Sequence, residues 1–157
     1  GSLPKNAGIV RIHVAGDFFS RQYLDAWYIV ALRNPKILFY AYTKSLRFWV
    51  GDMTESPELW NFVLTASYGG RDDHMIDEFN LRSAKVVFSE AEAAELGLEI
   101  DHDDSHAAKP TLRDDSFALL IHGTQPAGSD ASTALKQLKG KGSYSRKKQK
   151  ETDMLAT

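Results

Sequence analysis

Five apolar runs recur along this chain, and each of them ends in polar or chargeable residues. The first covers residues 9–20, and the other four read ILFYAYTKS, FVLTASYGGRDDH, AKVVFSE and FALLIHGTQ. Stretches with helical spacing separate these runs, so the chain alternates strand and helix. The alternation predicts an α/β fold with a mainly parallel sheet of about five strands and alternating helices. Either an open sheet or a partial barrel fits this pattern.

The expected strands cover residues 9–14, 37–42, 62–66, 84–88 and 117–121. Capping residues indicate where the helices between them begin. Ser20 precedes an apolar stripe with the i, i+3, i+4, i+7 spacing of one helix face. The other expected helices are a short one after Ser56 and Pro57, one that contains Met75, Ile76 and Phe79, one that begins at the Ser89–Glu92 capping box, and one that begins at Gly128 and Ser129.

Length and charge divide the chain into a body and a tail. We expect a single α/β domain over residues 9–139, because 157 residues is the size of one domain. Residues 1–130 hold 12 Lys and Arg against 19 Asp and Glu, a net charge of −7, whereas residues 131–157 hold 7 against 2, a net charge of +5. Residues 140–157 contain few apolar side chains, which predicts a basic disordered tail.

Composition excludes several classes of site. The chain has no cysteine, so it cannot supply thiolate zinc ligands, a cysteine nucleophile or the ligands of an iron-sulfur cluster. A metal would have to be bound by His, Asp or Glu. No apolar run reaches the roughly 20 residues that cross a bilayer, so we expect no membrane partner and a cytoplasmic location. The absence of a Gly-x-Ser-x-Gly motif argues against a serine hydrolase.

Polar side chains follow the expected strands at their carboxyl ends, where ligands of parallel α/β sheets bind. Asp17 and His122 are the candidate catalytic residues, as acid/base groups or metal ligands. The alternative is that these strand-exit residues only cap loops and helices. The candidate ligand or anion contacts are Ser20, Thr43, Lys44, Arg71, Thr124 and Gln125.

A second cluster lies in the sequence DHDDSH at residues 101–106, within a long polar insertion before the last strand. Carboxylates and imidazoles are ligands of divalent metals, so Asp101, Asp103 and His106 are candidate metal ligands. We expect Asp101 or Asp103 to lie within direct or water-bridged reach of His122 or Asp17. The alternative is a solvated acidic loop.

Phosphate and nucleic acid are the other ligands that the sequence suggests. Gly69-Gly70-Arg71 and the segment at residues 123–129 combine glycines with a cation or a helix start, although neither matches a P-loop and a glycine pair is often only a turn. The tail could neutralise nucleic-acid phosphates without reading sequence, or could simply aid solubility. Its candidate nucleic-acid contacts are Lys141, Arg146, Lys147 and Lys148.

Two segments resemble the gene product 88 family of phages and plasmids, one that reads VRIHVAGDFFSRQYLDAWYIVALRNP with ILFYAYTKS, and one that reads SAKVVFSEAEAAELGLEIDHDDSHA with LLIHGTQPAGS. The resemblance covers residues 9–145. Its most specific parts are a cluster and a strand end, formed by His13, Gly16, Asp17 and Ser20 and by Tyr42, Thr43 and Lys44.

The resemblance implies a phage or plasmid context, in an infected or plasmid-bearing bacterial host, and no particular reaction. Longer relatives look as though they carry an upstream segment with cysteines, and their strand-exit pattern is similar to part of a radical-SAM-like barrel. Because this chain has no cysteine, we expect it to be the C-terminal part of such a protein or a member of a cluster-free branch.

Three functional hypotheses remain from the sequence. The first is a phage-type α/β protein with a ligand-binding or catalytic pocket at the strand exits, for a divalent metal or a small phosphate-bearing ligand. The second is a nucleic-acid-binding module that uses the tail to bind DNA or RNA. The third is a protein-interaction factor without catalysis. Neither the substrate nor the homo-oligomeric state follows from the sequence.

Overall fold

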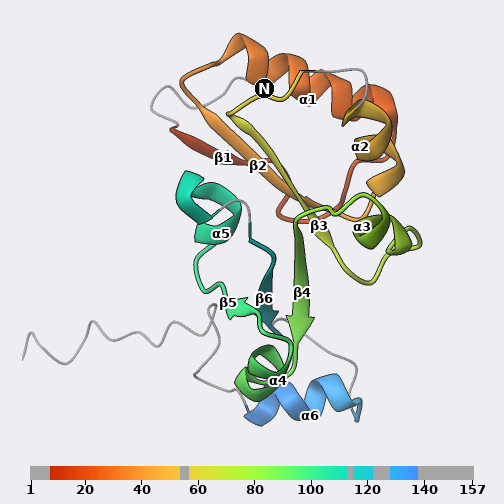
Figure 1. Cartoon of the computed structure of the whole chain (residues 1–157), viewed down its shortest axis with the longest axis vertical. Helices are drawn as coiled ribbons and strands as arrows, with labels where there is room; N and C mark the ends of the chain where they lie inside the picture. Colours follow the sequence, from red (N-terminus) through yellow and green to blue (C-terminus); the bar gives the residue numbers. More distant parts are fainter. Residues whose placement is uncertain (1–7, 54–56, 113–114, 122–127, 138–157) are drawn as a thin grey trace, which may run out of the picture. The chain divides into compact units, whose positions relative to one another are not determined.

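The computed structural model describes residues 8–53, 57–112, 115–121 and 128–137. Within them, six strands form one open, parallel sheet in the order β1-β2-β3-β4-β6-β5, alternating with helices (Figure 1). The strands are β1 (Ile9–Arg11), β2 (Leu38–Thr43), β3 (Phe62–Ser67), β4 (Ser83–Val87), β5 (Glu99–Ile100) and β6 (Phe117–Leu120). The predicted α/β fold is therefore confirmed, with one strand more than expected. The additional strand is β5, which has only two residues.

The helices are α1 (Arg21–Arg33), α2 (Leu46–Met53), α3 (His74–Glu78), α4 (Glu90–Glu95), α5 (Ser105–Ala108), the 3-10 helix η1 (Pro110–Leu112) and α6 (Asp130–Gln137). No helix of the described residues is long and apolar enough to cross a membrane.

The described chain divides into two compact units. Unit 1 comprises residues up to Lys85 together with Asp104–Phe117, and unit 2 comprises Val86–Asp103 with the residues from Ala118 onward. The chain therefore passes from one unit to the other at three places. Whether residues 9–139 behave as a single domain stays a prediction, and the tail at 140–157 lies outside the described residues.

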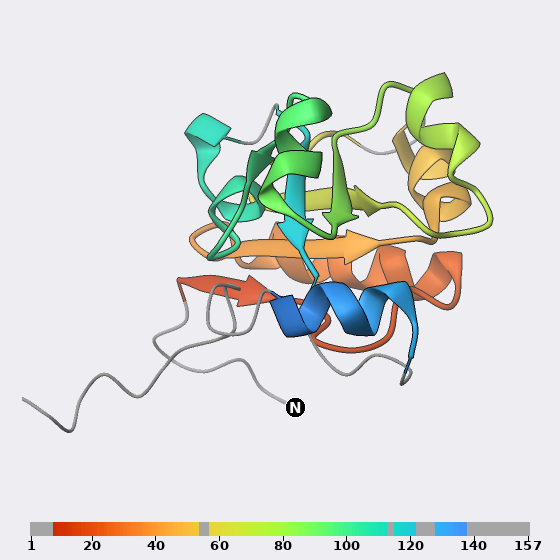
Figure 2. The same ribbon diagram turned by 90° about the horizontal axis from the view of Figure 1, so that it is seen from below.

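In unit 1 the two faces of the sheet carry different chemistry. Side chains alternate along a strand, so Phe39 and Ala41 of β2 face α1, whose Trp27 and Leu24 pack against them. Figures 1 and 2 show α1 running alongside β2. Tyr40 and Tyr42 point to the opposite face, where the short helix α5 contacts β2 and β3.

The helix start at Ser20 and the capping box at Ser89 are confirmed. Each serine hydroxyl accepts the backbone N–H three residues later, at 3.2 Å in α1 and 3.1 Å in α4. Glu92 closes the box one residue earlier than the usual pattern, because its carboxylate accepts the backbone N–H of Phe88 at 2.7 Å. Gly97 ends this segment with a φ of +66°, as its position predicts.

The short helix expected after Ser56 and Pro57 was wrong: Ser56 lies outside the described residues, and the described residues from Pro57 to Asn61 are not helical. The helix of this region, α2, begins at Leu46 instead. Leu46 is fully buried, and Trp49 and Val50 lie at i+3 and i+4 on the same core. The segment after Pro57 leads into β3, and the carbonyl of Asn61 already accepts the backbone N–H of Phe39 at 2.8 Å. This pairing outweighs the helix-starting signal of a serine followed by proline.

Candidate functional site

Asp17 joins the exits of β1 and β2. Gly16, with a φ of +88°, turns the chain after β1 and brings the Asp17 carboxylate to the end of the neighbouring strand. Oδ1 accepts the hydroxyl of Thr43 at 2.6 Å and the backbone N–H of Phe18 at 2.7 Å, and Oδ2 accepts the backbone N–H of Lys44 at 2.6 Å. The carboxylate thus fixes two loops against each other.

Thr43 extends this clamp. Its side chain is buried, and its oxygen accepts the backbone N–H of Ser45 at 3.0 Å while its hydroxyl donates to Asp17. The Ser45 hydroxyl in turn donates to the carbonyl of Phe18 at 2.6 Å. Polar groups that follow β1 and β2 are therefore bonded mainly to one another, which orders the loops that lead into α1 and α2.

A second carboxylate orders the exit of β3. The backbone N–H groups of Gly69 and Gly70 donate to the carboxylate of Asp73 at 2.9 and 2.8 Å. Both amides therefore already have a hydrogen-bond acceptor from the chain itself. The ammonium of Lys44 reaches over from the β2 exit and donates to the carbonyl of Tyr68. A Cβ atom at Gly70 would lie 3.1 Å from Cβ of Lys44, so glycine allows this close approach.

The carboxylates at the exits of β1, β2 and β3 have bonded partners, whereas several cations there have no ionic partner among the described residues. Arg47 pairs with Asp72 at 3.6 Å, but Lys44, Arg71 and Lys85 form no ion pair among the described residues. Nζ of Lys85 lies 5.9 Å from the ring centre of Tyr68, whose carbonyl holds Lys44. The exits of β1, β2 and β3 therefore combine internally bonded carboxylates with cations that have no ionic partner in the described part of the chain.

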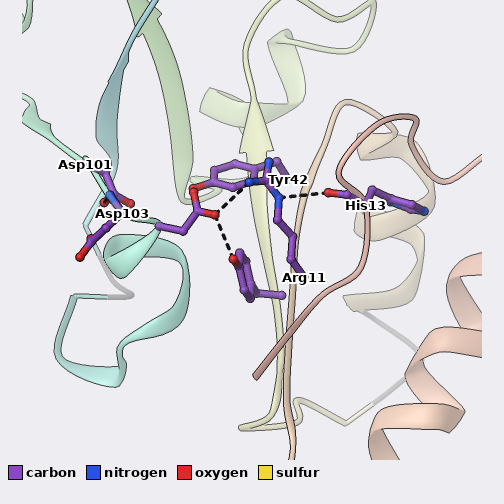
Figure 3. A network of polar contacts seen from close by, with 7 residues as sticks. Arg11, His13, Tyr42, Asp101 and Asp103 are labelled. Carbon is purple, nitrogen blue, oxygen red and sulfur yellow. Dashed lines mark hydrogen bonds and ion pairs between the residues drawn. The ribbon is translucent and has the colours of Figure 1, made fainter. Parts of the chain in front are cut away.

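The opposite face of unit 1 carries a second polar network, shown in Figure 3. The carboxylate of Asp104 accepts hydrogen bonds from the guanidinium of Arg11 and the hydroxyls of Tyr40 and Tyr42, each at 2.9 Å. Arg11 also donates to the carbonyl of His13 at 3.0 Å, and its guanidinium lies 5.1 Å from the ring centre of Tyr42. Arg11, Tyr40, Tyr42 and Asp104 form what we name the Asp104 network.

A family model named Gene product 88 matches residues 2–140 of this sequence. The chain belongs to the Gene product 88 family. The expected phage-type family is thereby confirmed. No curated protein and no solved structure matches the chain.

Several of the sequence-predicted residues of this Gene product 88 protein lie together. Asp17, Thr43 and Lys44 are in direct contact at the strand exits, as described above. Ser20 serves as the N-cap of α1, and Arg71 is exposed in the loop after β3. Their roles in binding or catalysis stay predictions, because the contacts found here are those of loop and helix caps.

Of the predicted metal ligands of this Gene product 88 protein, Asp103 is exposed, as the alternative of a solvated acidic loop requires, but Asp101 and His106 are not. Asp101 is buried, with 2% of its surface exposed, and it accepts the backbone N–H of Asp103 at 3.2 Å. His106 is also buried, and the centre of its ring lies 5.0 Å from the centre of the Phe117 ring. Across residues 8–53, 57–112, 115–121 and 128–137, no group of three or more His, Asp or Glu side chains is arranged to bind a metal.

The remaining predicted sites fall outside the described residues. These are His122, Thr124 and Gln125 after β6, and Lys141, Arg146, Lys147 and Lys148 in the tail. The expected approach of Asp101 or Asp103 to His122 or Asp17 also stays a prediction, because His122 is not described and Asp17 belongs to the other unit.

Sequence reasoning missed three residues that the structure shows to be central. The first is Arg11, which pairs with Asp104. The second is Arg82, which donates to the hydroxyl oxygen of Thr65 at 2.6 Å and to the carbonyl of Leu64 at 3.0 Å. The third is Asn61, which is buried. The available signal was a charged or amide side chain inside an apolar strand run or directly before one, since such groups need bonded partners when covered.

Proposed function

We propose that this protein binds a small phosphate-bearing ligand at the carboxyl ends of β1, β2 and β3, with the ammonium of Lys44 as its main anion contact. The supporting observation is the imbalance at this edge of unit 1. Asp17 and Asp73 are occupied by loop N–H groups, and Asp72 has Arg47 as a partner. Lys44, Arg71 and Lys85 form no ion pair within the described residues.

An anion gains from this arrangement in two ways. Cations that are not neutralised locally attract it. The helix α2 begins at Leu46, directly after the exit of β2 at Thr43, so the positive end of its dipole also favours negative charge there. Because Asp73 occupies the amides of Gly69 and Gly70, the ligand would be bound by side chains rather than by a backbone loop of the P-loop kind.

Pyrophosphate, inorganic phosphate and adenosine monophosphate serve as probes, at constant ionic strength, in thermal unfolding and calorimetric titration. We expect a saturable rise in Tm for the native protein. Lys44→Met should weaken binding at least about tenfold, since a hydrogen bond to a charged group contributes about 1.5 to 3 kcal/mol.

Lys36→Met is the matched control for this experiment. Lys36 is exposed and precedes β2, so this variant removes the same charge from the amino end of the strand. It should bind the probe as the native protein does. Equal losses of affinity in the two variants would mean that the probe responds only to the net charge of the protein, which contradicts a site at Lys44. An unchanged affinity in Lys44→Met would contradict the proposal as well.

A divalent metal is part of the same proposal, as a bridge between the ligand's phosphate and the carboxylate of Asp17, whose Oδ2 accepts one N–H and keeps a lone pair for an ion. Repeating the pyrophosphate titration with Mg²⁺ and with a chelator tests it, because a bridging ion should raise the affinity and Asp17→Asn should remove the gain. A catalytic role for Asp17, nucleic-acid binding by the tail, homo-oligomerisation and a cytoplasmic location in the host stay predictions.

A further inference from the structure

The Asp104 network has the composition of a carboxylate-binding site. A guanidinium and two hydroxyls converge on one carboxylate, and both of its oxygens are used: Tyr42 donates to Oδ1, whereas Tyr40 and Arg11 donate to Oδ2. Arginine with neighbouring hydroxyl donors is a recurring means of recognising planar carboxylates. The carboxylate comes from a residue 62 to 93 positions away from its three donors.

The donors are positioned by contacts of their own. Arg11 is held by the carbonyl of His13 and lies against the ring of Tyr42, and that ring meets Phe117 edge-on at 6.2 Å. Tyr40 and Tyr42 belong to a central strand that pairs with a neighbour on each side. The binding geometry of these three side chains therefore has supports other than Asp104.

Asp104 itself is held less well. It has a φ of +62°, which for a residue other than glycine costs about 1 kcal/mol or more, and it begins a helix of four residues without capping it. Its side chain is 18% exposed and that of Arg11 29%, so solvent reaches the pair. An occupant in a strained backbone conformation, at an accessible site, is one that an external group can replace.

We propose that Arg11, Tyr40 and Tyr42 form a binding site for an external carboxylate, and that Asp104 fills this site until such a ligand displaces it. The ligand class is a small organic acid or a chain terminus, both of which present a planar carboxylate. The site is separate from the phosphate-binding edge: it uses the opposite face of β2 and none of the residues proposed there.

Chemical rescue tests the proposal. Asp104→Gly removes the carboxylate and permits the positive φ, so the native backbone remains accessible while the site is emptied. The Tm of this variant is measured against formate, with chloride added to keep the ionic strength constant. At formate concentrations ten times the dissociation constant, Tm should rise by about 3 to 6 °C, whereas the native protein, whose site is filled, should change by less than about 1 °C.

Two further variants and a pair of peptides make the result specific. The double variant Asp104→Gly with Arg11→Met should lose the formate response, and Asp103→Gly, which removes the neighbouring exposed carboxylate, should show none. A peptide with a free C-terminus, set against the same peptide amidated, distinguishes a chain terminus from a small acid as the source. A folded Asp104→Gly variant whose Tm ignores formate, or a response that survives Arg11→Met, overturns the proposal.

Hydrogen exchange covers the case in which Asp104→Gly does not fold even in formate. In the native protein, molar formate should then speed amide exchange at Ser105–Lys109 at least about twofold relative to chloride, because displacement of Asp104 frees the start of α5. Unchanged exchange in this segment would overturn the proposal equally.

Discussion

The replacement of Asn61 by aspartate tests how the end of α1 is joined to the strands. Asn61 is 2% exposed, and its side-chain NH2 group donates to the carbonyls of Ala31, Asn34 and Ile37 at 2.9, 3.1 and 2.9 Å. Aspartate has the same shape but replaces this donor with an acceptor. Three carbonyl oxygens would then face a buried carboxylate.

The expected cost follows from the groups left without donors. The substitution removes the two N–H donors that serve the three carbonyls, and each buried acceptor left unsatisfied costs about 1 to 3 kcal/mol. The new charge adds to this, so Asn61→Asp should lower the free energy of unfolding by about 3 to 5 kcal/mol. Asn34→Ala is the control, because Asn34 makes one side-chain bond near the same helix end, to Val30 at 2.7 Å. It should cost about 0.5 to 1.5 kcal/mol.

Urea denaturation followed by tryptophan fluorescence is a suitable assay. The chain's three tryptophans, Trp27, Trp49 and Trp60, all belong to unit 1, so the signal reports the unit that contains Asn61. The midpoint should fall with an unchanged m-value. If Asn61→Asp costs no more than Asn34→Ala, the three carbonyl contacts do not contribute to stability as the geometry implies.

Two more predictions concern caps and loops. Ser20→Ala and Ser89→Ala should each lower the free energy of unfolding by about 1 kcal/mol, because each removes a capping hydrogen bond, whereas Ser20→Gly should cost only about a few tenths of a kcal/mol. Thermal unfolding followed by circular dichroism measures these differences. Equal effects of alanine and glycine at Ser20 would argue against the capping bond. Thr43→Val should cost about 1 to 3 kcal/mol in urea denaturation, because it removes the bonds to Asp17 and to the N–H of Ser45 without changing volume, and a stability equal to that of the native protein would show that the clamp is not stabilising.

The sequence predicted what local patterns determine. The strand and helix order follows from periodicity and capping residues. Ser20 and Ser89 mark the starts of α1 and α4, and Gly97 marks the end of α4, through contacts with residues close by in the sequence. The helix α2 was missed because apolar residues fill most of LRFWVGDM, so no single stripe is evident until its neighbours are known.

The candidate site was predictable only in part. Asp17 and Lys44 were found from the rule that strand exits meet at one edge, which topology alone supplies. The Asp104 network was not predicted, because Asp104 lies 62 to 93 residues from its three partners in the sequence. Arg11, Tyr40 and Tyr42 share one face of the sheet only because of the register in which β1 pairs with β2. For Arg82 and Asn61, too, the bonded groups lie 17 to 30 residues away.

The outer strands of the sheet are short, and this bears on how copies of the chain can associate. The strand at one edge, β1, has three residues, and β5 at the other edge has two. At about 3.3 Å per residue, such edges offer roughly 10 Å or less of backbone, against about 17 to 20 Å for a typical strand. Among the residues that the structure describes, edge-to-edge joining of sheets, a route to aggregation, therefore has little backbone to pair along. Any specific self-association of this protein should depend on side-chain surfaces and not on an extended ladder.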